Sequence, residues 1–204
     1  MARKSNDLDK KMVAAGIELI QEGGIARLST REIADRAGAN LGMFNYHFGT
    51  KEKFILKILN DFYQKFLDDL MGLPGKDPEL ETVLLQIAAF SRDNRRLLTP
   101  ILSDVLAGDK VVTRFLKKNF SKHFLVLQLA LKRHLKQKNL SILNPHHAIR
   151  FLIGAVGVPN ILLEISEKGS RSKSSPESDE ELMSRVKAAI IGLESDLCIS
   201  KMRS

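Results

Sequence analysis

The sequence predicts an all-α protein of about nine helices, and three observations lead to this prediction. Apolar residues recur at intervals of three and four along most of the chain, which is the period of one helix face. No segment shows the apolar–polar alternation of a half-buried strand. Glycine and proline clusters, such as Gly23-Gly24 and the stretch 72–78, separate the periodic segments.

Composition sets the broad class. The 204 residues suffice for one large domain or two small ones, and 44% of them are apolar, enough for a buried core. Residues 1–10 lack the apolar segment of a secretory signal. The single Cys198 has no partner for an internal disulfide, so we expect a reducing, cytoplasmic location. The longest uncharged apolar run, 151–163, has 13 residues and contains Pro159, which predicts a buried helix and no membrane span.

The first helix and the motif after it carry most of the information. An apolar stripe predicts a helix that Gly23-Gly24 ends; its members are Leu8, Met12, Ala15, Gly16, Leu19 and Ile20. Residues 29–32, Ser-Thr-Arg-Glu, have the form of a capping box and predict a second helix start. Ile33, Ala34 and Ala37 then face inward.

A turn and a third helix follow. Gly38 can adopt the left-handed conformation that ends the second helix. Asn40 is the expected N-cap of a helix over 41–48, which Phe44 and Phe48 anchor on its buried side. This order of elements is a helix-turn-helix, which presents its second helix to the DNA major groove.

Lys51 begins the next helix, after the expected N-cap Thr50. A cation in a first turn opposes the helix dipole. A phosphate bound there would be stabilised by both the free amides and the ammonium. The alternative is a surface lysine offset by Glu52, and both interpretations stay open.

The remaining helices follow from periodicity and breakers. We expect them over about 51–70, 79–92, 95–107, 110–138, a segment opening at Asn144-Pro145, and 178–199. Phe54, Ile58, Phe62 and Phe66 repeat every four residues along the first of these. Residues 169–178 are polar and serine-rich and predict a mobile loop.

The net charge of +8 lies mostly outside the motif. Residues 1–50 contain seven Lys/Arg and six Asp/Glu, whereas residues 109–150 contain ten Lys/Arg and one acid. A solvated helix face is the simpler interpretation of this basic segment. Long-range attraction to DNA and preference for an anionic ligand are the alternatives.

Residues 10–55 resemble the DNA-binding domain of the TetR family of bacterial transcriptional regulators. The resemblance rests on several features together: Ala14-Ala15, the Gly23/Gly24 stop, Ile33-Ala34, Ala37-Gly38, Tyr46-His47-Phe48 and Lys51. It implies a DNA-binding domain over residues 1–50. It also implies a helical effector-binding and dimerisation domain over residues 51–204.

The family often has two adjacent aromatics before the histidine, and this chain has Asn45 at the first position. Residues 40–43, Asn-Leu-Gly-Met, match the family's base-reading stretch and contain no Arg or Lys to reach guanine. We expect adenine contacts from Asn40 or Asn45 and thymine-methyl contacts from Leu41 or Met43. Gly42 would permit close backbone approach.

The resemblance also implies contacts to the phosphate backbone, which fix register without reading sequence. The candidates are Ser29, Thr30, Arg31, Tyr46, His47 and Lys51. His47 could instead be a packed, hydrogen-bonded residue, and Ser29 could be only a cap.

In the second half, the family resemblance implies a cavity for a small-molecule effector. The aromatics of these helices are either its lining or plain core: Phe62, Phe66, Phe90, Phe115, Phe120 and Phe124. Small residues suggest close helix pairing in a homodimer, with internal packing as the alternative: Gly154, Ala155, Gly157, Ala188, Ala189 and Gly192.

The leading hypothesis is a cytoplasmic, ligand-responsive regulator, acting as a repressor on an inverted-repeat operator; an activator role is the alternative within the same fold. No catalytic motif for an enzyme is found, and we assign no catalytic residue, cofactor or metal. Neighbouring His146-His147 lack metal-site spacing. A helical adaptor without DNA binding is a further alternative, since residues 1–50 are nearly neutral.

Overall fold

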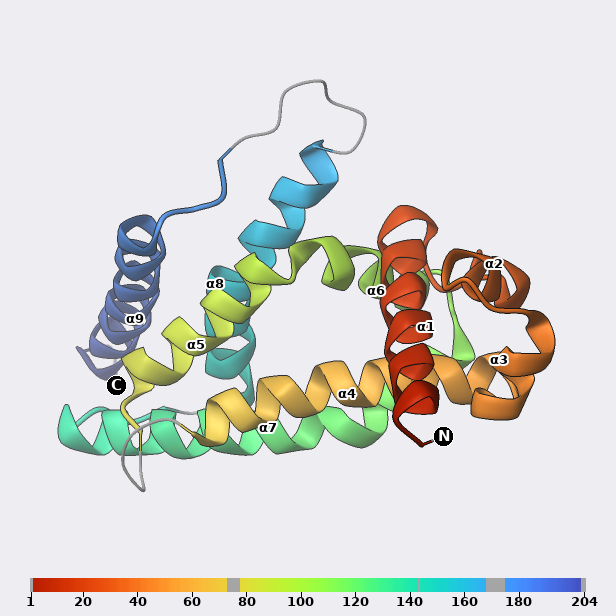
Figure 1. Ribbon diagram of the computed structural model, residues 1–204. Coiled ribbons are helices and arrows are strands. Elements are labelled where there is room, and N and C mark those ends of the chain that lie inside the picture. Colours follow the sequence, from red (N-terminus) through yellow and green to blue (C-terminus); the bar gives the residue numbers. More distant parts are fainter. Residues whose placement is uncertain (1, 73–77, 143, 168–174, 203–204) are drawn as a thin grey trace. The chain divides into compact units, whose positions relative to one another are not determined.

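The computed structural model describes residues 2–72, 78–142, 144–167 and 175–202. Within these ranges the chain forms nine α-helices and no strand (Figure 1), so the all-α prediction is confirmed. The helices are α1 Ala2–Gly23, α2 Thr30–Arg36, α3 Leu41–Phe48, α4 Lys51–Met71, α5 Leu80–Asp93, α6 Arg95–Leu106, α7 Lys110–Gln137, α8 Pro145–Glu167 and α9 Asp179–Met202. Most of the predicted loop 169–178 lies outside the described residues, as do the side chains of Phe120 and Cys198.

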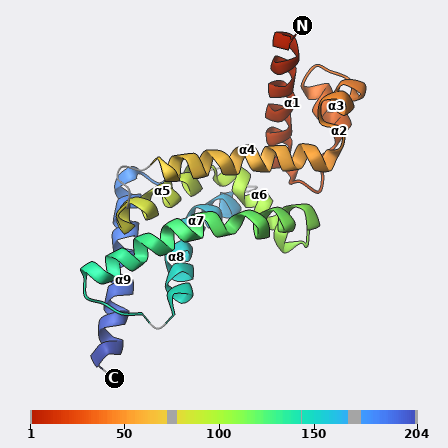
Figure 2. The same cartoon turned by 90° about the horizontal axis from the view of Figure 1, so that it is seen from below.

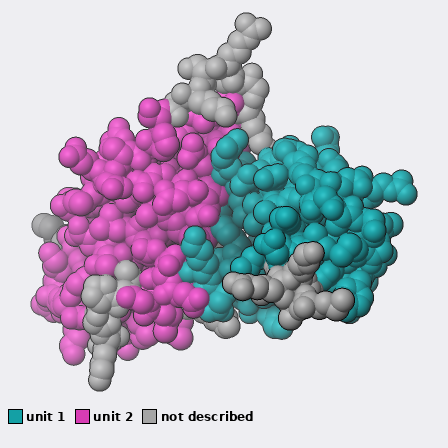
Figure 3. Space-filling model, in the orientation of Figure 1, with its two compact units in different colours: residues 1–65, 96–119 teal, residues 66–95, 120–204 magenta. Residues whose placement is uncertain are grey.

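The helices form two compact units, which Figure 3 colours separately. Unit 1 comprises residues 1–65 and 96–119, and thus α1 to α3, most of α4 and α6, and the start of α7. Unit 2 comprises residues 66–95 and 120–204, and thus α5, α8, α9 and the later parts of α4 and α7. The helix-turn-helix therefore shares a compact unit with a later segment of the chain.

An aromatic cluster fixes α3 against α4 inside unit 1. Phe44 and Phe54 are fully buried and Phe48 is nearly so. The ring centroids lie 5.4 Å apart for Phe44 and Phe48, 5.1 Å for Phe44 and Phe54, and 4.7 Å for Phe48 and Phe54. These spacings are those of tilted and edge-to-face pairs, which stabilise beyond simple burial. Figure 2 shows α1, α2 and α3 gathered beside the beginning of α4.

The same cluster requires a glycine on α1. A Cβ on Gly16 would lie 2.6 Å from two ring carbons of Phe54 and 2.9 Å from Cδ1 of Ile58. Real Cβ atoms do not approach carbon this closely, so α1 crosses α4 at a distance that only glycine allows. The crossing brings Met12 and Ile20 of α1, both fully buried, into the same core.

In unit 2, α5, α8 and α9 pack together through polar links as well as apolar side chains. The Ser91 hydroxyl of α5 donates to the Gly157 carbonyl of α8 at 2.6 Å. Arg185 of α9 donates to the carbonyls of Ala155 and Val156 at 2.9 and 2.5 Å. Its guanidinium also pairs with Glu177 at 2.5 and 2.8 Å. These bonds fix the faces that α8 and α9 turn toward each other.

The sequence predicted a buried helix around residues 151–163, but only one side of α8 is buried. By length and composition α8 could cross a membrane, with a mean hydropathy of 1.7 over its best window, yet only 33% of that window is buried. Gly157 and Ala189, grouped in the sequence with the pairing face, are instead buried within unit 2. The opposite side of α8 is both apolar and exposed; it carries Phe151, Val158, Leu162 and Ile165, exposed by 44%, 41%, 58% and 51%.

Replacement of Gly16 by alanine should destabilise the protein by about 1–3 kcal/mol, because the new methyl group overpacks the Phe54 ring. The matched control is Gly157→Ala, whose Cβ would have no heavy atom within 4 Å. It should be neutral or stabilising by up to about 1 kcal/mol, since alanine favours helix over glycine. Urea denaturation followed by circular dichroism measures both. Equal stabilities for the two variants would contradict the close crossing.

Candidate nucleic-acid interface

The two short helices begin and end through local hydrogen bonds. Ser29 is the N-cap of α2, and its hydroxyl accepts from the Glu32 amide at 3.4 Å. After α2, Gly38 has φ +71°, and the Ala39 amide donates back to the Ala34 carbonyl at 2.8 Å. These contacts end α2 and reverse the chain into α3, as the sequence predicted.

Asn40 caps α3, and this role uses its carbonyl. The Oδ1 atom accepts from the Met43 amide at 3.0 Å. A Cβ on Gly42 would lie 3.1 Å from the same oxygen, so Gly42 leaves room for the cap. Bidentate reading of adenine needs both the carbonyl and the amide of an asparagine. The cap therefore competes with the base contact expected of Asn40.

The outer face of α3 is open to solvent. Phe44 and Phe48 hold the inner face, whereas Leu41, Met43 and Tyr46 are exposed by 38%, 40% and 85%. Asn45 is exposed as well, and its carboxamide is not part of the cap. An α3 with one buried aromatic face and one exposed mixed face has the form of a DNA-reading helix.

His47 occupies a different environment from its neighbours. Its side chain is only 7% exposed, and its Nδ1 lies 2.5 Å from Oδ1 of Asp9 on α1. The structure thus places it as the packed residue that the sequence left as an alternative. A link between α1 and α3 is its observed role, and the sequence offered no signal for Asp9.

The start of α4 has the arrangement expected of a phosphate site. The Thr50 hydroxyl accepts from the Lys53 amide at 3.2 Å, which confirms Thr50 as the N-cap. Glu52, expected to offset Lys51, lies instead 3.4 Å from Nη1 of Arg114. Among the described residues, no acid pairs with Lys51. Its ammonium thus stays available beside the free amides of this helix terminus.

Most acids of the first 50 residues face cations within the scaffold. Arg36 on α2 donates to both carboxylate oxygens of Glu22 on α1, at 2.6 and 3.0 Å. It also lies 3.7 Å from a carboxylate oxygen of Glu18 and of Glu32. The hydrogen bonds from Arg36 lower the pKa of Glu22 below its ordinary value.

Although residues 1–50 carry nearly equal numbers of acidic and basic side chains, the two kinds of charge lie in different places. Three of the six acids, Glu18, Glu22 and Glu32, gather around Arg36. Arg31 of α2, in contrast, is exposed, and Thr30 is half-buried. Lys51 and Arg31 thus remain as positive charges at two helix starts. The sequence showed the balance of charge in residues 1–50 but not its separation in space.

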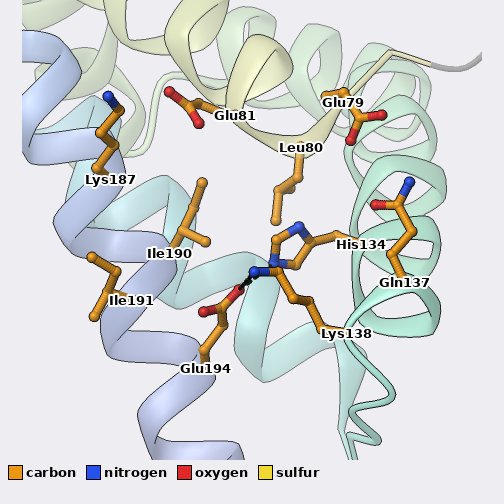
Figure 4. A pocket seen from close by; sticks show the side chains of 10 residues that line it. All are labelled: Glu79, Leu80, Glu81, His134, Gln137, Lys138, Lys187, Ile190, Ile191 and Glu194. Atoms are coloured by element: carbon orange, nitrogen blue, oxygen red, sulfur yellow. Dashed lines mark hydrogen bonds and ion pairs between the residues drawn. The ribbon is translucent and has the colours of Figure 1, made fainter.

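Unit 2 contains a pocket of about 440 Å3 between the start of α5, the end of α7 and α9 (Figure 4). Its lining is mixed in charge: Glu79, Leu80, Glu81, His134, Gln137, Lys138, Lys187, Ile190, Ile191 and Glu194. Glu194 Oε1 lies 2.8 Å from Nε2 of His134 and 3.7 Å from Nζ of Lys138. The sequence assigned none of these lining residues to an effector site.

Other residues that the sequence singled out have ordinary surroundings. Phe66 and Phe115 are buried, and the Phe66 ring packs on Phe90 at 4.4 Å between centroids. Arg133 of the basic helix pairs with Glu79 at 3.2 Å. His146 and His147 are exposed, and the part of the chain that the structure describes holds no group of three or more metal-ligating side chains.

In a comparison with known protein families, residues 12–58 match the family described as bacterial regulatory proteins, tetR family. A probable HTH-type transcriptional regulator of Bacillus subtilis, YttP, is 20% identical over 147 residues, 69% of this chain and 71% of its own. An uncharacterized HTH-type transcriptional regulator of the same organism, YvdT, is 30% identical over 84 residues, 41% of this chain and 43% of its own.

Solved structures share the fold over most of the chain. A protein of Clostridium perfringens described as a putative fatty acid metabolism regulator has a TM-score of 0.69 at 17% identity, with 86% of this chain and 94% of that chain covered. A TetR transcription regulator of Haloarcula marismortui has a TM-score of 0.68 at 17% identity, with 90% and 95% covered.

Proposed function

Because the chain is a DNA-binding transcriptional regulator of the TetR family, we propose that it is a homodimeric repressor. It binds an inverted-repeat operator in double-stranded DNA and leaves it when a small-molecule effector binds. The observation that carries this proposal is the two-sided α3, anchored by Phe44 and Phe48 and open along Leu41, Met43, Asn45 and Tyr46. The cytoplasm, where the DNA lies, is its place of action, and we assign it no enzymatic activity.

Residues 1–50, together with Lys51 at the start of α4, supply the DNA contacts in this proposal, and the rest of residues 51–204 binds the effector and the second copy. Asn45 reads adenine, Leu41 and Met43 contact thymine methyl groups, and Asn40 remains the cap of α3. The backbone contacts come from Ser29, Thr30, Arg31, Tyr46 and Lys51. His47 contributes by packing on Asp9, and Gly42 lets the α3 backbone approach the bases.

The exposed apolar sides of α8 and α9 form the dimer interface. A Cβ on Gly192 of α9 would lie 3.7 Å from the Phe151 ring of α8, so the two helices present one continuous face. Ile191 and Met183 extend it on α9, at 60% and 42% exposure. A two-fold dimer sets two α3 helices at half-sites about 34–36 Å apart, or a multiple of that spacing.

The effector binds in unit 2, where the 440 Å3 pocket is the candidate site. Release from DNA requires that the effector bind the DNA-incompetent arrangement more tightly than the competent one. A salt-dependent gel shift on the DNA upstream of the gene tests the function as a whole. Activation of transcription from the bound site would replace the repressor role, and absence of any shift would favour a helical adaptor.

We expect Asn45→Ala to relax base preference at an adenine of each half-site, at a cost of about 1–3 kcal/mol in discrimination. The matched control is Asn40→Ser, which keeps a capping oxygen but removes the carboxamide, and it should leave the selected sequence unchanged. Selection of binding sites from random duplexes measures both. A guanine-dominated half-site for the wild type would contradict the proposed readout.

Lys51→Gln should flatten the slope of log affinity against log salt by about 0.9 for each phosphate that the lysine neutralises in the wild type. Site preference should not change, because phosphate contacts carry no sequence information. Lys117→Gln on the exposed face of α7 is the control and should leave the slope as it is. If the Lys51 variant kept the wild-type slope, Lys51 would neutralise no phosphate and would be an ordinary solvated surface residue.

Leu162→Glu should convert the dimer to a monomer, because it places a charge in an apolar interface. Leu106→Glu, at the end of α6 and 89% exposed, is the matched control and should remain dimeric. Sedimentation velocity at micromolar concentration measures both. Dimers for both variants, or a wild-type monomer that binds single half-sites, would contradict this interface.

A further inference from the structure

A buried carboxylate lies beside the turn that joins α1 to α2. Asp104, near the end of α6, is 8% exposed, and among the Asp, Glu, Lys and Arg residues of the described chain it alone is buried. Its Oδ2 accepts from the backbone amide of Ile25 at 2.6 Å. Both residues belong to unit 1, although 79 positions separate them in sequence.

Neither local preference nor burial explains an aspartate at this position. An acid in the last turn of a helix opposes the helix dipole. A buried carboxylate also loses its hydration, which is costly unless hydrogen bonds replace it. The Ile25 amide supplies such a bond, and a hydrogen bond to a charged group is stronger than one between neutral groups.

The turn is equally dependent on the carboxylate. Ile25 is 1% exposed, so without an acceptor its amide would be a buried, unsatisfied donor. Gly24 precedes it with φ +80°, and a Cβ there would lie 3.1 and 3.2 Å from the two carboxylate oxygens. The absence of a side chain at Gly24 therefore leaves room for the Asp104 carboxylate.

We propose that Asp104 is a positioning residue for DNA binding. By holding the Ile25 amide, its carboxylate fixes the direction in which the chain leaves α1 and enters α2, and so the placement of α3 beside α1. Buried Leu97 and Ile101 of the same helix add apolar contacts in the core of unit 1. The proposal rests on the DNA-binding function above and adds a residue of α6 to it.

The test uses the full-length chain and the duplex that the wild type selects from random DNA. Asp104→Ala should weaken binding to that duplex by at least about tenfold and speed exchange of the Ile25 amide by a similar factor. Asp104→Asn should recover most of both, since its carbonyl still accepts. Leu97→Ala, a cavity in the same core, is the matched control; it should change both much less than Asp104→Ala does, at a temperature where every variant is folded.

A second pair of variants approaches the contact from the turn. Gly24→Ala and Gly108→Ala both place a methyl group at a residue with positive φ. At Gly24 the methyl group would press on the Asp104 carboxylate. At Gly108, with φ +87°, it would meet nothing within 4 Å. Gly24→Ala should reduce DNA affinity and Ile25 protection, and Gly108→Ala should not. This pair and Asp104→Asn decide the matter if Asp104→Ala fails to fold.

Two outcomes overturn the proposal in distinguishable ways. If the wild type selects a duplex and Asp104→Ala binds it as tightly as Leu97→Ala does, Asp104 is only a structural residue and the DNA-binding function stands. If the wild type selects no duplex at all, the proposed function fails and the role of Asp104 in DNA binding fails with it. In that second case, rapid Ile25 exchange in Asp104→Ala would still show the hydrogen bond itself.

Discussion

The presentation of α3 depends on the aromatic cluster of Phe44, Phe48 and Phe54. The first two rings occupy one side of an eight-residue helix that is too short to be stable alone. Their packing on Phe54 fixes which side faces the protein, and the remaining side chains then face solvent. Gly16 permits this by letting α1 approach the Phe54 ring. In the proposed function, recognition of DNA by α3 therefore depends on a packing constraint in the core.

Electrostatics in the first 50 residues follows from the same scaffold. A near-neutral count of charges is by itself a poor basis for binding a polyanion, yet the acids are not spread evenly. Glu18, Glu22 and Glu32 surround Arg36, and Asp9 faces His47. Glu18 and Glu22 join α1 to α2 through Arg36, and Asp9 joins α1 to α3 through His47. Arg31 and Lys51 are left at the starts of two helices, where the dipole also favours an anion.

The packing of unit 2 bears on whether the apolar helix α8 is a core helix or a membrane span. The long apolar helix α8 meets the simple criteria for a membrane span, but its inner side is tied to α5 and α9 through Ser91, Gly157 and Arg185. Its outer side is apolar and exposed, and in the proposed function a second copy covers it. One helix thus serves an internal core and, in our proposal, an interface.

The sequence by itself determined what depends on neighbours along the chain. Helix limits, the caps Ser29, Asn40 and Thr50, and the turn at Gly38 were all predicted, because each is set by residues three or four positions away. Only the tertiary structure decided that His47 packs on Asp9 and that Asp104 holds the Ile25 amide. Those contacts join positions far apart in sequence, and no local pattern or periodicity encodes such pairs.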